Sequence, residues 1–367
     1  MFSAADHDFM ARALRLARRG LTSTTPNPRV GCVIVMDGTV VGEGWHRRAG
    51  EPHAEVYALQ AAGASARGAT VYVTLEPCSH HGRTPPCANA LIDAGVTRVV
   101  AAMRDPNPQV CGRGLSALTA TGIVTQCGLM ETEAGELNIG FVSRVTRGRP
   151  WVRLKLAASL DGKTALNNGV SQWITGPAAR RDGHRWRARA CAILSGIGTV
   201  RADDPRLSVR DVATERQPLK VVVDARLELP THARVLAEGT VLVACAVADG
   251  ANADALRRRG AELVYLPDGD GRVNLAALLT ELGRRGVNEL HVESGYRLSG
   301  ALLRAGLVDE LLLYLAPCLL GDAARGMFDL PELTSLDDQR RLKIRELRRI
   351  GDDLRVLARI IQSSVSR

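Results

Sequence analysis

Four side chains near the start of the chain could together hold and use a metal ion. His53 and Glu55 stand two residues apart in His53-Ala54-Glu55, and Cys78 and Cys87 bound the segment CSHHGRTPPC. Catalytic zinc commonly takes three protein ligands and leaves one position for water, and two thiolates with one imidazole form a known set. We therefore expect His53, Cys78 and Cys87 to bind zinc (Zn2+) and Glu55 to stay off the metal as the catalytic acid and base.

A zinc ion beside a carboxylate suits the hydrolytic removal of an amino group from an aromatic ring. Such a group leaves only after water has added to the carbon that bears it. Zinc lowers the pKa of bound water to about 7, and Glu55 could carry the water's proton to a ring nitrogen and then to the departing ammonia. The order His-x-Glu followed by Pro77-Cys78 is typical of zinc nucleobase deaminases. The alternative is a chance trio of a helix-start histidine and two structural cysteines.

Other residues around this motif allow more than one interpretation. His80 and His81 could be rival zinc ligands or could touch a substrate. We expect Asn27 and His46 to line the same pocket without binding metal. Cys32 and the five further cysteines are dispersed along the chain, which predicts buried thiols and not a disulfide framework.

Composition narrows the class of protein. A chain of 367 residues, 46% hydrophobic and 24% charged, is typical of a globular enzyme of two or three domains. The net charge of +9 favours anionic partners, such as phosphorylated metabolites, nucleotides or nucleic acid. Aromatic residues at 4% do not favour stacking on single-stranded nucleic acid, and basic residues spread along the chain are also consistent with a solvated surface.

The sequence offers no membrane-targeting signal that we recognise. The start MFSAADHDFM lacks a basic region followed by an apolar core, and no apolar run reaches the roughly 18 residues needed to span a bilayer. We therefore expect a cytoplasmic protein that binds neither membrane nor nucleic acid.

Alternating strands and helices should position the metal motif. In the first half, a hairpin is expected around Asp37-Gly38 within residues 25–46. Helices are expected at 6–19, 53–62 and 87–94, after 114 and from about 131, and strands at 69–75, 97–103 and 122–127. This alternation predicts βαβ units with a partly parallel sheet. Ligands bind at the carboxyl ends of such strands, where both metal-binding segments would fall.

The basic segment RVTRGRPW at 144–151 contains glycine and proline and separates two periodic regions. We therefore expect one domain at 1–146 and a second at 150–367. A fresh α/β pattern follows this segment. Strands are expected at 152–158, 191–195, 219–224, 240–245, 261–266, 288–293 and 308–316, helices from 175–177 to about 190 and at 252–259, 274–285 and 296–305, and a closing hairpin around Gly351-Asp352.

The second half carries a further group of polar residues. In LHVESGYRLSG at 290–300, two glycines flank a helix start, and such a turn can lay a phosphate against backbone N–H groups. A plain tight turn is the alternative. Glu293 ends the preceding strand and could accept hydrogen bonds from a ligand. Arg187 and Arg210 lie in basic segments that could bind a phosphorylated ligand or form a solvated face.

These motifs resemble, over essentially the whole chain, the bifunctional riboflavin-biosynthesis deaminase/reductases of bacteria. The first half carries PNPRVGCVIV, GWH, EPHAEVYAL, TLEPCSHHGRTPPC and DPNPQVCGRG, and the second half carries KLAASLDGKTA, SQWITG, DDPRLSVR, VVVDAR and HVESG. Eight residues separate Cys78 from Cys87, which differs from the C-x-x-C of other deaminases and is the riboflavin-type pattern. The resemblance implies an α/β protein with an N-terminal cytidine-deaminase-like αβα domain and a C-terminal dihydrofolate-reductase-like α/β domain.

The resemblance also implies two successive reactions. The first domain would hydrolyse the 2-amino group of 2,5-diamino-6-(5-phosphoribosylamino)pyrimidin-4(3H)-one and release ammonia. The second would use NADPH to reduce the ribosyl chain to ribityl, giving 5-amino-6-(5-phosphoribitylamino)uracil. The implied partners are this small phosphorylated pyrimidine and, in a homo-oligomer, further copies of the chain.

Roles follow from position in the family pattern. His53, Cys78 and Cys87 match the zinc ligands, and Glu55 matches the proton donor. The substrate-binding positions are Ser171, Arg187, Leu207, Arg210 and Glu293. The NADPH-binding positions are Ala157, Trp173, Thr199, Asp203, Gly295, Tyr296, Arg297, Leu298, Ser299, Gly300 and Ala301. Ala225 stands where some relatives have serine, Tyr296-Arg297 fills a turn that is often smaller, and Trp173 could instead pack in the core.

Two other functions remain open from the residues alone. A nucleic-acid deaminase of the tRNA or cytidine type, with an accessory domain, would share the zinc chemistry and the basic charge, and its affinity for RNA should fall steeply with salt. A zinc-dependent binding protein would neither release ammonia nor oxidise NADPH, whereas a flavin-synthesis enzyme would do both.

Overall fold

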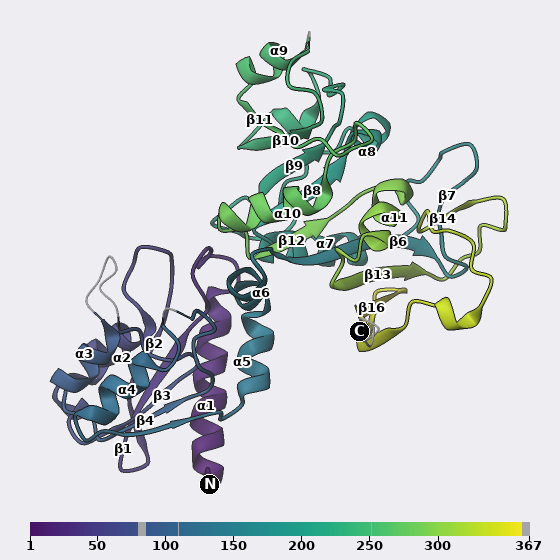
Figure 1. The fold of residues 1–367 in the computed structure, drawn as a ribbon. Coiled ribbons are helices and arrows are strands. Elements are labelled where there is room, and N and C mark those ends of the chain that lie inside the picture. Colours follow the sequence, from purple (N-terminus) through teal and green to yellow (C-terminus); the bar gives the residue numbers. More distant parts are fainter. Residues whose placement is uncertain (80–85, 109, 251, 362–367) are drawn as a thin grey trace. The chain divides into compact units, whose positions relative to one another are not determined.

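The computed structural model describes residues 1–79, 86–108, 110–250 and 252–361. His80 and His81 lie outside the described residues. The chain packs as two units, Met1–Gly148 and Arg149–Arg367, and the division falls inside the segment 144–151. Each unit combines one main sheet with helices, so the α/β class expected from the sequence is confirmed (Figure 1).

The first unit is built on a five-stranded sheet of order β2-β1-β3-β4-β5. Its strands are β1 (Gly31–Met36), β2 (Thr39–Trp45), β3 (Thr70–Val73), β4 (Arg98–Ala101) and β5 (Val124–Cys127). β1 is antiparallel to β2 and β3, whereas β3, β4 and β5 are parallel. Asp37 and Gly38 have φ values of 49° and 75°, the backbone that a two-residue hairpin turn requires, so the expected hairpin is confirmed.

Helices cover both faces of this sheet. They are α1 (Ala4–Ala17), α2 (Ala54–Ala62), α3 (Cys87–Asp93), α4 (Arg113–Ala120), α5 (Glu131–Leu137) and α6 (Ile139–Arg147). Neighbouring strand residues point to opposite faces. Gly31 lies against the backbone of α1, and Gly44, the cross-strand partner of Cys32, lies against the backbone of α2. The unit therefore has three layers, helix–sheet–helix.

The helix expected from about residue 131 is broken in two. Asn138 stands between α5 and α6. Its side-chain oxygen accepts the backbone N–H of Arg29 at 2.8 Å, and its amide donates to the Arg29 carbonyl at 2.9 Å. These two hydrogen bonds to the Arg29 backbone hold Asn138 where the helix is interrupted, because asparagine side chains that bond backbone groups disfavour a helix interior.

The second unit contains a nine-stranded sheet of order β11-β10-β9-β8-β12-β6-β13-β16-β15. Its strands are β6 (Trp151–Ser159), β8 (Ala192–Gly196), β9 (Leu219–Val223), β10 (Val241–Cys245), β11 (Ala261–Tyr265), β12 (Glu289–Val292), β13 (Glu310–Ala316), β15 (Leu342–Ile350) and β16 (Asp353–Ile360). The strands from β11 to β13 run parallel, and β16 and β15 close the sheet as an antiparallel pair. The closing hairpin was expected.

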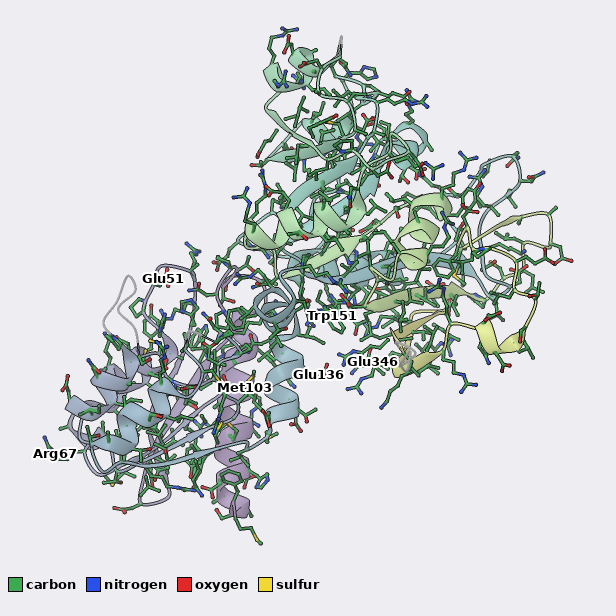
Figure 2. All side chains as sticks on the ribbon, viewed as in Figure 1. Glu51, Arg67, Met103, Glu136, Trp151 and Glu346 are labelled. Carbon is green, nitrogen blue, oxygen red and sulfur yellow. The ribbon has the colours of Figure 1, made fainter. Side chains whose placement is uncertain are left out.

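The helices of the second unit are α7 (Pro177–Arg189), α8 (Ile197–Asp203), α9 (Ala253–Arg258), α10 (Leu275–Arg284) and α11 (Tyr296–Arg304). The sequence analysis missed α8 and the small pair β7 (Lys163–Ala165) and β14 (Arg325–Gly326). Apolar side chains of α10 and α11 pack with those of β6, β12 and β13 to form the main core, which the side chains fill (Figure 2). Within the described ranges, no helix combines the length and the apolar character that crossing a membrane requires.

Candidate active sites

Close packing of α2 on β2 fixes the first metal-binding segment. A Cβ atom on Gly42 would stand 2.2 Å from the Ala58 carbonyl oxygen, and one on Gly44 would stand 2.3 Å from that of Ala54. Only glycine allows the helix to lie this near the strand. His53 is the N-cap of α2 and Glu55 lies in its first turn, so both side chains are held at the helix start.

The two cysteines reach the same place from different elements. Cys78 lies in irregular backbone that follows β3, and Cys87 is the first residue of α3. The N–H of Cys87 donates to the Cys78 sulfur at 3.3 Å, and the N–H of Ala88 donates to the Cys78 carbonyl at 3.1 Å. These bonds hold the Cys78 backbone and thiol against the start of α3.

The three expected ligands are spaced as zinc ligands are. His53 Nδ1 lies 3.3 Å from Cys87 Sγ and 3.6 Å from Cys78 Sγ, and the three ligand atoms all fall within 4.8 Å of one another. Tetrahedral zinc, with bonds of about 2.3 Å to sulfur and about 2.0 Å to nitrogen, separates such atoms by about 3.5 Å. The residues therefore fit the metal. Among the residues that the structure describes, no second group of three such side chains was found.

Glu55 is buried beside these ligands and is 3% exposed. Its burial, and then the nearby Cys78, raise the pKa of Glu55 to about 7, although His53 acts in the opposite direction. Hydrogen bonds from Cys87 and His53 lower the pKa of the Cys78 thiol against the effect of burial, while the pKa of the Cys87 thiol is raised. These shifts favour a thiolate at Cys78 beside a Glu55 carboxyl group that can gain or lose a proton near neutral pH.

His46 and Asn27 lie beside the ligands. His46 is 2% exposed, and its ring stands edge-on to that of His53 with centroids 5.4 Å apart. His46 Nδ1 is 3.1 Å from the Pro52 carbonyl and must donate to it, so Nε2 accepts from the Asn27 amide at 3.1 Å. Both ring nitrogens are occupied, which agrees with the expectation that His46 does not bind metal.

In the second unit, Arg187 and Glu293 form the centre of the expected substrate group. The Arg187 guanidinium donates to both Glu293 carboxylate oxygens, at 2.5 Å and 2.8 Å, and to the Ser208 carbonyl at 3.0 Å. Arg210 is exposed and bonds the Ser208 hydroxyl at 3.1 Å. Buried Leu207, with a φ of 49°, turns the chain between these contacts. The structure brings these four expected residues together; Ser171 lies half-buried at the start of the 171–176 segment.

Hydrogen bonds link three of the segments that carry expected cofactor residues. The N–H of Gly295 donates to the Thr199 hydroxyl at 3.0 Å, and Gln172, the neighbour of Trp173, donates to Asp203 at 3.2 Å. Gly295 is the N-cap of α11, and no side chain caps that turn, which fits an anionic group such as the phosphates of NADPH. Trp173 is 70% exposed, so the core-packing alternative is wrong.

Not every residue of the expected 295–301 segment is accessible. Tyr296, Leu298 and Ala301 are half-buried, Arg297 is exposed, and Ser299 is fully buried and bonded to Ser294. A Cβ on Gly300 would stand 2.2 Å from the Asp329 carbonyl oxygen, so this glycine accommodates a neighbouring backbone. Ala157 lies on β6 in register with Tyr314 of β13.

Sequence reasoning missed two ionisable residues of the second site and wrongly expected three cysteines to be buried. Burial and then Arg187 lower the pKa of Lys155, while Glu293 raises it. His291 is fully buried, 3.2 Å from a Glu293 oxygen, and burial lowers its pKa. An ionisable residue inside an otherwise apolar strand was the available signal for both. None of the eight cysteines forms a disulfide, as expected, but Cys111 and Cys318 are exposed and Cys127 is only half-buried.

An αβα unit that gathers two thiols, an imidazole and a buried carboxyl group defines a protein of the zinc-dependent deaminase class, here joined to a second α/β unit. Residues 3–103 match the family described as the cytidine and deoxycytidylate deaminase zinc-binding region, and residues 150–356 match the RibD C-terminal domain. The chain belongs to the RibD family of riboflavin-biosynthesis proteins, as the sequence motifs predicted.

Full-length relatives support this conclusion. The chain is 52% identical to the riboflavin biosynthesis protein RibD of Escherichia coli, over 95% of this chain and 98% of that protein. It is 49% identical to RibD of Haemophilus influenzae, over 97% of each. The solved structure of Acinetobacter baumannii RibD has a TM-score of 0.91 at 43% identity, covering 98% of this chain and 99% of that one.

A Thermotoga maritima structure described as a diaminohydroxyphosphoribosylaminopyrimidine deaminase/5-amino-6-(5-phosphoribosylamino)uracil reductase has a TM-score of 0.87. It is 33% identical and covers 97% of this chain and 99% of that one. The similarity therefore spans both units in sequence and in fold.

The geometry of the first site predicts one zinc ion per chain. Cys78→Ala or Cys87→Ala removes one of three ligands, and we expect either variant to lose both zinc and ammonia release, because a site with two protein ligands holds the ion weakly. Elemental analysis of gently purified protein measures the metal. Wild-type protein with no zinc, or with two ions per chain, would contradict the assignment.

Proposed function

We propose that this protein catalyses two successive steps of riboflavin biosynthesis, with residues 1–146 acting as the deaminase and residues 150–367 as the reductase. Its substrate would be 2,5-diamino-6-(5-phosphoribosylamino)pyrimidin-4(3H)-one and its final product 5-amino-6-(5-phosphoribitylamino)uracil. The observation that carries the proposal is the convergence of His53, Cys78 and Cys87 around the buried Glu55 carboxyl group. The activities named for the Thermotoga maritima protein support the choice of substrate.

In the deaminase, His53, Cys78 and Cys87 would hold zinc, which supplies a Lewis acid that makes hydroxide available at neutral pH. Glu55 moves the protons. Its carboxylate accepts a proton from the attacking water and delivers it to a ring nitrogen. It then takes the remaining proton from the added hydroxyl group and passes it to the amino group, which departs as ammonia while the C–O bond becomes a carbonyl. A pKa raised by burial suits a group that must both accept and donate. The paired ring nitrogens of His46 keep the imidazole beside His53 neutral and fixed.

In the reductase, NADPH supplies the hydride when bound. We assign it the positions expected from the sequence, with the open first turn of α11 and exposed Arg297 facing its phosphates and exposed Trp173 offering a ring surface. Thr199 is tied to Gly295, and Gln172 ties Asp203 to the backbone beside Trp173. The chain thus holds the three cofactor segments in one place before the cofactor arrives.

The two arginines of the substrate group have different roles in this proposal. Three of the five N–H donors of Arg187 already serve Glu293 and Ser208, so Arg187 mainly fixes the Glu293 carboxylate. The Arg210 side chain is exposed and donates one hydrogen bond, to the Ser208 hydroxyl. Burial and the nearby cations Arg187, Arg206 and Arg234 lower the pKa of its guanidinium group. Arg210 is therefore the better holder of the substrate's 5-phosphate, because a phosphate dianion favours permanently charged, planar donors.

We also propose that the protein is a homo-oligomer in the cytoplasm. On β15, Ile344 and Leu347 are 63% and 60% exposed. Ile344 and Leu347 pair with Ala358 and Val356 of β16. Ala358 in turn pairs with Leu311 of β13, where the same face of the sheet is buried in the main core under the helices. An uncovered apolar face on an edge strand favours pairing with a second copy. Eight unpaired cysteines favour a reducing compartment.

The proposed function is tested with purified protein, the diaminopyrimidine phosphate and NADPH. We expect ammonia release from the pyrimidine alone, NADPH oxidation only after deamination, and a product mass that reflects both steps. A protein that performs neither reaction, or that instead binds RNA with a steep dependence on salt, would refute the proposal.

Glu55→Gln should retain zinc and lose deamination. The amide keeps the shape of the side chain but carries no proton, and general acid–base catalysis is worth about 10²–10⁴-fold. Reduction of pre-deaminated substrate should continue at the wild-type rate, because Glu55 lies in the other unit. Deamination at a near-normal rate would refute the role of Glu55, and loss of reduction would refute the assignment of one activity to each domain.

Arg210→Ala should raise the reductase KM about ten- to a hundredfold for phosphorylated substrate, since a hydrogen bond to a charged group contributes about 1.5–3 kcal/mol. Dephosphorylated substrate should be unaffected. Arg187→Ala should instead lower kcat for both forms, because Glu293 loses its cation. Arg181→Ala, an exposed change on the same helix α7, is the control. Equal phosphate preference in wild type and Arg210→Ala would disprove the phosphate contact.

The double variant Ile344→Lys/Leu347→Lys should form a smaller species than the wild-type oligomer. Both the deaminase and the reductase activity of the full-length chain should persist. Leu336→Lys is the control, because Leu336 is 82% exposed but lies outside the β15–β16 face. Sedimentation at several protein concentrations measures the change. A monomeric wild-type chain, or a double variant with wild-type assembly, would count against this face.

A further inference from the structure

Glu76 is a buried carboxylate that the chemistry described above does not use. It is 3% exposed and lies two residues before Cys78. Its Oε1 accepts the backbone N–H groups of Gly114 at 2.9 Å and Leu115 at 3.3 Å. Its Oε2 accepts those of Gly112 at 2.9 Å and Asp105 at 3.2 Å. Four backbone donors from one distant segment therefore converge on a single side chain.

These donors belong to the start of α4 and to the loop before it. Gly112 is the N-cap of α4 and has no side chain, so no cap comes from the helix's own sequence. The first N–H groups of a helix need acceptors and carry partial positive charge. Glu76, which follows β3, supplies both an acceptor and a negative charge to the start of α4. A charged acceptor also forms the stronger hydrogen bonds that offset its own burial.

The same helix turn touches the peptide next to a metal ligand. A Cβ on Gly114 would stand 1.8 Å from the carbonyl oxygen of Pro77, the residue directly before Cys78. The N–H of Glu76 also donates to the carbonyl of Met103, which follows β4 and is labelled in Figure 2. The backbone of residues 76–78 is thus held between the end of β4 and the start of α4.

Cys78 needs such support because it belongs to no helix or strand. Residues 74–79 are irregular, whereas Cys87 gains its position from α3 and His53 gains its position from the start of α2. The contacts from Cys87 and Ala88 tie Cys78 to the start of α3. Glu76 and Gly114 tie the two residues before Cys78 to the start of α4.

We infer that Glu76 is a positioning residue of the deaminase site, which fixes the Cys78 ligand by anchoring α4 against Pro77. This inference rests on the proposed deaminase function. Residues that orient metal ligands typically change metal affinity or activity by about 10- to 100-fold when they are replaced. Replacing Glu76 should therefore change zinc binding and deamination and leave the reductase activity of the second unit unchanged.

Glu76→Gln tests the inference in the full-length zinc protein. The amide nitrogen cannot accept, so two of the four N–H groups lose their partner. We expect faster exchange of the amide protons of residues 105, 112, 114 and 115 and about ten- to a hundredfold faster loss of zinc to a chelator. We also expect a shifted visible spectrum in the cobalt-substituted protein. The deaminase kcat should fall by a similar factor with KM changed less than about threefold, while reduction is unchanged.

Two further variants make the outcome decisive. Glu133→Gln changes an exposed carboxylate of the same unit and should match wild type in every measurement. Gly114→Ala keeps the glutamate at position 76 but forces the start of α4 away from Pro77, so it should reproduce the spectral shift and the loss of kcat. Glu76→Asp keeps the charge and should recover part of the lost activity.

Distinct results separate the possible failures. Wild-type amide exchange, zinc retention and kcat in Glu76→Gln would overturn the inference. If Glu76→Gln unfolds the first unit, a wild-type cobalt spectrum in Gly114→Ala would overturn it, and a shifted spectrum would support it. A wild-type chain that holds no zinc and releases no ammonia would refute the proposed function itself.

Discussion

A carboxylate that leaves water must find hydrogen-bond donors or a cation, or else it takes up a proton. Two buried glutamates, Glu55 and Glu76, and the half-buried Glu293 meet this constraint in three ways. Glu76 finds four backbone N–H groups and serves as an anchor. Glu293 finds Arg187, which holds its pKa well below the usual range although burial alone would raise it. Glu55 has no comparable set of donors, and burial raises its pKa. The surroundings of each carboxylate therefore indicate its task.

Parallel strands bring the chemistry of each unit to one edge of its sheet. In the first unit, β3 leads to Cys78 and β4 leads to the loop that Glu76 anchors. In the second, β12 leads to Glu293 and Gly295, and β8 leads to Thr199. The carboxyl end of a parallel strand is followed by a helix start, which favours anions and thiolates. Two different reactions can therefore use the same structural arrangement.

The sequence predicted what depends on local patterns. The Asp37-Gly38 hairpin, most strands and the ligand set follow from turn residues, strand periodicity and short motifs. The break at Asn138 was not predictable, because it depends on hydrogen bonds to Arg29 more than one hundred residues away. The Arg187–Glu293 ion pair was missed for the same reason, because the sequence indicated only that Arg187 could bind a phosphorylated ligand or lie on a solvated face. Contacts distant in sequence leave no local pattern.

The spacing of the two cysteines explains why an anchor is needed. In a C-x-x-C motif, one turn of backbone positions both sulfurs. Here eight residues separate Cys78 from Cys87, so a shared turn cannot fix both. Helix α3 fixes Cys87, and Cys78 depends on what holds irregular backbone after β3. Glu76 and the close approach of Gly114 to Pro77 meet that need. In this protein, the widely spaced cysteines leave Cys78 without the support of a shared turn, and a buried carboxylate provides a second point of attachment.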